Sequence, residues 1–97
     1  MSYDLILRVG KELREDRLDI DLSAIRSFAA LLGGELLTGA TTPRKQGERF
    51  GTLIFAEDPR TINDQAMVGS FIRFARDCGL LVEDPQLGEI LDADQQD

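Results

Sequence analysis

The chain has no histidine and no tryptophan, and its single cysteine is Cys78. Without histidine it lacks the commonest general base and metal ligand, and it cannot build a Ser-His-Asp or Cys-His centre. One cysteine can form neither a disulfide within the chain nor a structural zinc site, which needs four ligands. No Walker loop and no Gly-x-Gly-x-x-Gly motif are present. We therefore expect no catalytic residue, no metal and no cofactor, and hence no enzyme.

Long apolar runs are also absent. The longest, Phe28–Leu32 and Gly79–Val82, are far shorter than the roughly 20 residues that cross a bilayer. The first twenty residues carry nine charged side chains, which does not fit the apolar centre of a signal peptide. We expect a cytoplasmic protein that neither spans nor binds a membrane.

Basic residues are missing from the last fifth of the chain. Residues 1–76 hold 11 basic and 11 acidic side chains, whereas residues 77–97 hold seven acids and no base. The net charge of −7 therefore belongs to that last segment. An acidic field repels phosphate backbones and attracts basic proteins. The segment is either a solubilising tail or a docking surface for a basic protein, and both interpretations argue against a nucleic-acid partner.

Apolar residues make up 42% of the 97 positions, which is enough for one packed core and one domain. Period-two alternation marks the strands, and helical spacing marks two helices. We place a charged surface loop over Lys11–Asp19, an N-cap at Asp21, and a capping box at Thr61 and Asp64. The expected strands are Tyr3–Val9, 35–39, 50–56, Leu80–Glu83 and 89–91, and the expected helices are 22–32 and 61–78.

This β-α-β-β-α-β order is typical of a ferredoxin-like sandwich, in which two helices cover one face of a four-stranded antiparallel sheet. The last short strand would add a C-terminal edge to that sheet. We expect a single α+β domain over residues 1–91. The acidic tail of residues 92–97 is expected to be disordered.

Two Glu-Asp-Pro sequences each follow a predicted strand. Glu57–Pro59 follows the third long strand, and Glu83–Pro85 follows the fourth. Paired carboxylates can share acid–base work or hold a hard cation, provided that they meet. We predict that these two strands run in opposite directions. The two acidic pairs would then lie at opposite ends of the sheet and act only as turns closed by proline.

The segment Glu48–Phe55 resembles the RNP1 segment of RNA-recognition motifs, and it falls on the third strand, as it does in that family. Phe50 matches one of the base-stacking positions. Thr52 stands at the second stacking position, Glu48 replaces the opening basic residue, and Ile6 occupies the aromatic position of the first strand. The resemblance implies RNA binding, but one ring of three beside a net charge of −7 makes it the third hypothesis.

The segment Phe74–Leu91 resembles the C-terminal part of small acidic bacterial proteins. It runs from a helix through glycine and a strand to Asp-Pro-Gln-Leu-Gly and a second strand. Some of these proteins are similar to immunity proteins, which neutralise polymorphic toxins. The resemblance implies a bacterial protein that acts by covering a partner's surface, and it assigns no functional residue.

We expect the sheet face without helices to form an interface, because Asp4, Ile6 and Arg8 lie on it with some of Leu53, Ile54 or Phe55. The first hypothesis is a protein-binding module without catalytic activity, inhibitory in the manner of an immunity protein, with a basic protein as its partner. The alternative is a ligand-sensing regulatory domain that acts as a homodimer through this face. The expected partner-binding residues are Ile6, Arg44, Lys45, Arg49, Phe50, Glu83, Asp84 and Glu89.

Overall fold

The computed structural model describes residues 2–10, 15–38 and 45–92, with the backbone alone for residues 15–21. Its elements are β1 (Tyr3–Val9), α1 (Glu15–Leu31), β2 (Gly34–Leu37), β3 (Arg49–Phe55), α2 (Pro59–Ile62), α3 (Gln65–Asp77), β4 (Leu80–Asp84) and β5 (Glu89–Ile90). The five strands form one sheet in the order β2-β3-β1-β4-β5. All neighbouring strands are antiparallel, so the chain has the expected α+β class.

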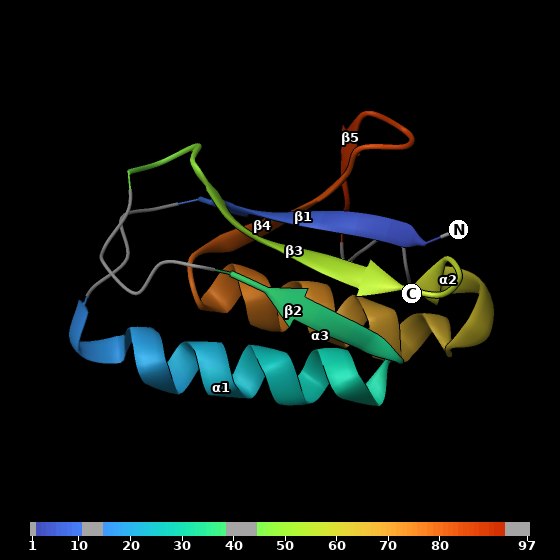
Figure 1. Ribbon diagram of the computed structural model, residues 1–97, viewed down its shortest axis with the longest axis horizontal. Helices are drawn as coiled ribbons and strands as arrows, with labels where there is room; N and C mark the ends of the chain where they lie inside the picture. Colours follow the sequence, from blue (N-terminus) through green and yellow to red (C-terminus); the bar gives the residue numbers. More distant parts are fainter. Residues whose placement is uncertain (1, 11–14, 39–44, 93–97) are drawn as a thin grey trace.

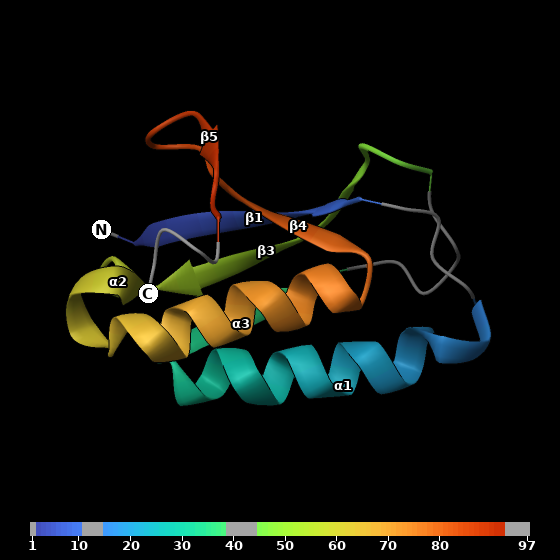
Figure 2. The same cartoon turned by 180° about the vertical axis from the view of Figure 1, so that it is seen from behind.

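The molecule has two layers. Helices α1 and α3 lie side by side under one face of the sheet, and the β4–β5 hairpin rises on the opposite side (Figures 1 and 2). Among the described helices, none combines the length and apolar character needed to span a membrane. The sheet face turned away from α1 and α3 is called the open face below.

The core lies between the sheet and the two long helices. Leu5, Leu7 and Val9 of β1 are buried in it, as the alternation in this strand predicts. The rings of Phe28 and Phe71 meet edge to face, with their centroids 5.2 Å apart, and join α1 to α3. Each large apolar side chain that is fully buried stabilises the fold by about 1.5–3 kcal/mol. The rigid layer that results positions the surfaces described below.

Helix α1 begins earlier than expected. The N-cap predicted at Asp21 is wrong, because α1 starts at Glu15. The loop predicted over Lys11–Asp19 is wrong for residues 15–19, while residues 11–14 lie outside the described part of the chain. Leu18 precedes Leu22 by four positions, so helical spacing continues backwards from the predicted start. The same leucines also fit strand alternation, and local sequence alone could not separate the two patterns.

The second predicted helix is two helices. Asp58 caps α2 by accepting a hydrogen bond of 2.9 Å from the backbone nitrogen of Arg60, and Pro59 occupies the first helical position. Asp64 caps α3 with a bond of 2.8 Å to its first turn. The capping box predicted at Thr61 is therefore wrong. The Asp-Pro pair was the stronger helix-start signal, since proline favours the first helical position after an Asp cap.

Two glycines adopt a left-handed backbone conformation where the chain turns. Gly33 follows α1 with φ of 89°, and Gly88 lies in the β4–β5 turn with φ of 69°. Residues other than glycine rarely adopt this left-handed region. Cys78 is partly buried against the core, which is typical of a free cysteine.

Candidate functional site

The two Glu-Asp-Pro sequences lie at the same end of the sheet, and the prediction that they lie at opposite ends is wrong. Strand β1 is antiparallel to β3 and also antiparallel to β4, so β3 and β4 run in the same direction. Their C-terminal ends therefore flank the start of β1. This arrangement brings Asp58 and Asp84 to either side of Tyr3 and Arg60.

Arg60 is the centre of a polar network that also contains Tyr3, Asp58, Asp84 and Gln86. Its Nε donates to Asp58 Oδ1 at 2.9 Å, and its Nη2 donates to Asp58 Oδ2 at 3.0 Å. The same Nη2 donates to the Tyr3 hydroxyl at 2.6 Å and forms an ion pair with Asp84 Oδ2. The Tyr3 hydroxyl donates in turn to Asp84 Oδ2 at 2.5 Å. One guanidinium thus joins the start of β1, the start of α2 and the end of β4.

The second oxygen of Asp84 holds the turn that follows β4. Asp84 Oδ1 accepts from the backbone nitrogens of Gln86, at 2.9 Å, and Leu87, at 3.2 Å. It also accepts from the Gln86 side-chain amide at 2.8 Å. Asp84 is fully buried, with 0% exposure, and a buried carboxylate needs such partners to remain ionised.

Burial and hydrogen bonding within the polar network shift the pKa values of Asp84, Arg60 and Tyr3. Burial acts to raise the pKa of Asp84, but the hydrogen bonds to its two oxygens outweigh burial and hold that pKa below its ordinary value. Hydrogen bonding to Asp58 raises the pKa of Arg60 above its ordinary value. Burial, together with the bond to Asp84, raises the pKa of Tyr3. At neutral pH the network therefore contains ionised Asp84, a guanidinium and a neutral phenol.

The Arg60 guanidinium fills the centre of the polar network. The Arg60 guanidinium occupies the place between Asp58 and Asp84 where a bound cation would have to sit. Among the described residues, no three carboxylate or cysteine side chains gather closely enough to hold a metal ion. The donors and acceptors of the network are directed at one another.

The strand register shows which side chains lie next to one another on the open face. One row crosses all five strands, because each of its members is paired with the next. This central row consists of Leu37, Thr52, Ile6, Glu83 and Ile90. Leu37 and Ile90 stand at its two ends and are 49% and 48% exposed. Large apolar side chains are thus uncovered at both margins of the face.

The charges of the open face are separated along the strands. The row next to the start of β1 contains Glu35, Ile54 and Asp4 and forms the acidic end. The row next to the end of β1 pairs Arg8 with Arg49 and forms the basic end. Arg8 also donates to Glu83 at 2.6 Å. The face therefore has opposite charges at its two ends, and the row between them holds Leu37, Ile6 and Ile90 together with Thr52 and Glu83.

Most predicted partner-binding residues with charged side chains lie at the surface, but the structure separates them. Lys45 and Arg49 are exposed beside the basic end, whereas Glu89 is exposed on the β4–β5 hairpin at the other end of the sheet (Figure 1). Glu83 lies between them on the open face, bonded to Arg8. Arg44 lies outside the described residues.

The remaining predicted residues are buried. Asp84 belongs to the polar network, and Ile6 is 6% exposed in the central row. Phe50 is 3% exposed and packs in the core, so its ring is not available to stack on a base. Leu53 and Phe55 also face the core, and only Ile54 of the three proposed β3 residues lies on the open face.

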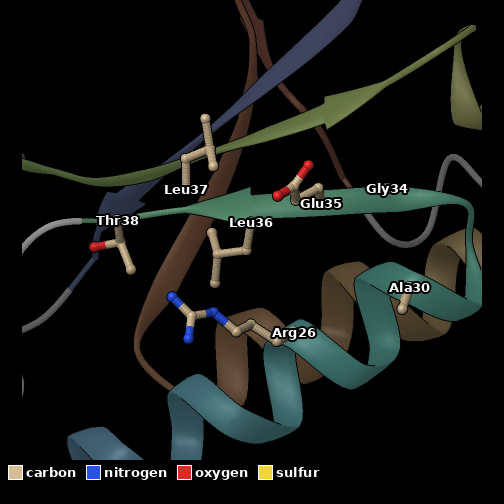
Figure 3. A pocket seen from close by; sticks show the side chains of 7 residues that line it. All are labelled: Arg26, Ala30, Gly34, Glu35, Leu36, Leu37 and Thr38. Carbon is tan, nitrogen blue, oxygen red and sulfur yellow. The ribbon is translucent and has the colours of Figure 1, made fainter.

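Sequence reasoning missed a groove between α1 and β2. Its volume is about 690 Å³, and Arg26 and Ala30 of α1 line it together with Gly34–Thr38 (Figure 3). Among the described strands, β2 has a neighbour on its β3 side only. Arg26 makes no hydrogen bond or ion pair with any described residue. The sequence could place Arg26 on the exposed side of a helix. It could not predict the groove, because the groove depends on how β2 packs beside α1.

No family model, no curated protein and no solved structure matches this chain. The likeness of Phe74–Leu91 to immunity proteins therefore stays a prediction.

Proposed function

We propose that the chain is a protein-binding module without catalytic activity and that its open face is the binding surface. The observation that carries this proposal is the pair of half-exposed side chains, Leu37 and Ile90, at the two margins of the central row. Apolar groups that stay exposed among charged neighbours are typical of protein interfaces. Asp58 and Asp84 accept hydrogen bonds from other members of the polar network, which supports a structural rather than a catalytic role for these two carboxylates.

We infer a ferredoxin-like arrangement for this module. The order β2-β3-β1-β4 of its first four strands supports this, since β1 and β3 lie together inside the sheet. Both long helices cover one face, which leaves the other face available (Figure 2). The β4–β5 hairpin extends the sheet at one edge and borders the open face.

A basic protein is the partner that the charge of the chain favours. The net charge is −7, and Glu83 and Glu89 lie on or beside the open face near the β4–β5 hairpin. Such a field speeds the encounter with a basic surface and weakens as salt is added. An inhibitory protein of the immunity kind is the form of this proposal that the segment Phe74–Leu91 favours.

A second copy of the chain is the second candidate partner, and the charge separation favours it. If one copy is turned end for end over the other, the acidic end of each open face meets the basic end of the other. Such an isologous contact is self-complementary. This arrangement would serve the alternative function, a ligand-sensing regulatory homodimer.

Capture experiments with face variants test the proposal. The immobilised wild type should retain specific proteins from a lysate of the cells that make it, and Ile90→Arg should lose them because a charge enters the apolar margin. Leu31→Arg is the matched control, since Leu31 is 70% exposed on α1, away from this face. Light scattering of the purified protein separates the candidates, because a dimer has twice the mass of the chain. A monomer that captures the same proteins with or without the Ile90 change contradicts the proposal.

A further inference from the structure

We propose that the groove between α1 and β2 binds an extended peptide segment of another protein and that Arg26 holds an acidic side chain of that segment. This surface is distinct from the open face, and the proposal does not depend on the function assigned to that face. It rests on three features of the groove: an edge strand, a guanidinium that bonds to no described residue, and the spacing of two α1 side chains.

The edge strand supplies backbone recognition. The outer side of β2 has no strand beside it among the described residues. An added strand would lie about 4.8 Å from β2, which is the space that the groove occupies. The groove volume, about 690 Å³, is in the range of binding pockets. Because all described neighbours in this sheet are antiparallel, an antiparallel peptide would continue the same hydrogen-bond pattern.

The guanidinium supplies charge recognition. Arg26 reaches from α1 toward the Leu36–Thr38 end of β2 (Figure 3). Glu35 also lines the groove, but its carboxylate lies on the other side of β2, away from Arg26 (Figure 3). Arg26 therefore keeps its donors for a ligand, and a guanidinium matches a carboxylate with two parallel hydrogen bonds.

The spacing along α1 sets the order of side chains in the peptide. Arg26 and Ala30 are one helical turn apart, about 6 Å, and strand residues two apart are separated by about 6.7 Å. Two alternate peptide side chains on the helix side would thus face Arg26 and Ala30 in turn. Ala30 lies near Gly34 (Figure 3), and its small methyl group leaves room for an apolar side chain. An antiparallel peptide would meet Arg26 first, which gives the order acidic, any residue, apolar.

A peptide selection tests this inference. A phage-displayed library of random peptides is selected on the whole chain, and the enriched peptide is synthesised for binding measurements. We expect enriched sequences to share the acidic-x-apolar order and to bind Arg26→Glu about tenfold more weakly or worse, because a charge-assisted pair is lost. Selection on Arg26→Glu should exchange the acidic residue for lysine or arginine.

Two controls keep this result separate from the open face. Ile90→Arg should bind the selected peptide as the wild type does, and the backbone amides of β2 should be the ones protected from hydrogen exchange. A library that enriches nothing, enriched peptides without an acidic residue or in the reverse order, or equal binding by Arg26→Glu would overturn the inference. The captures described for the open face would be untouched by any of these outcomes.

Discussion

Arg60 and Arg26 stand in two contrasting regions of one small molecule. Each is a helical arginine close to the sheet, yet Arg60 donates to Asp58, Asp84 and Tyr3, whereas Arg26 bonds to no described residue. The Arg60 side chain is 16% exposed, so its charge could not be buried without those partners. Arg26 is solvated and needs none. The contrast separates an arginine that stabilises the fold from one that is available for recognition.

Loss of Arg60 should have the largest effect on stability. Arg60→Leu leaves the buried carboxylate of Asp84 without its counter-charge, and removal of one partner of a buried pair costs about 3–5 kcal/mol. Urea unfolding measures the loss. Arg8→Leu is the matched control, because the Arg8–Glu83 side chains are 36% and 22% exposed and such pairs contribute about 1 kcal/mol or less. Equal losses in the two variants would contradict the distinction between the regions.

Acid should weaken the polar network through Asp84. The pKa of Asp84 in the folded chain is lowered, so its ionised form stabilises the fold fully above the unfolded value of about 4. That contribution disappears as the pH falls below about 4 and through the folded pKa. The free energy of unfolding of the wild type, from urea titrations between pH 6 and pH 3, should therefore fall more steeply than that of Asp84→Asn. Parallel pH profiles would show that Asp84 does not carry this dependence.

How far the sequence predicted this contrast depends on the range of the interactions. Period-two alternation predicted β1, and helical spacing placed the end of the first helix at residue 32, next to the observed end of α1 at Leu31, because both patterns are local. The polar network joins Tyr3 to Asp84, which lie 81 residues apart. We expected an antiparallel sheet without a particular strand order; in the observed order β1 lies between β3 and β4, so these two strands run in the same direction. The error lay in the assumed strand directions.

The open face was predicted in outline but not in detail. Asp4, Ile6 and Arg8 were placed correctly, because the alternation of β1 distinguishes its two faces. Strand β3 is apolar on both sides, and a shift of one residue exchanges all its side chains between faces. Leu53 and Ile54 could therefore not be assigned from sequence. The groove beside Arg26 depends on the packing of β2 against α1, for which no local pattern exists.

The smallest stability effect is expected at Arg26, and it sharpens the comparison most. Arg26→Leu repeats the change proposed for Arg60 at a position where the charge has no described partner. The free energy of unfolding should change by no more than about 0.5 kcal/mol, as for most surface substitutions. Urea unfolding beside the wild type and Arg60→Leu measures the difference. If Arg26→Leu lost as much stability as Arg60→Leu, Arg26 would have to hold the fold together. Its charge would then not be available to a peptide, and the two arginines would no longer represent different uses of one side chain.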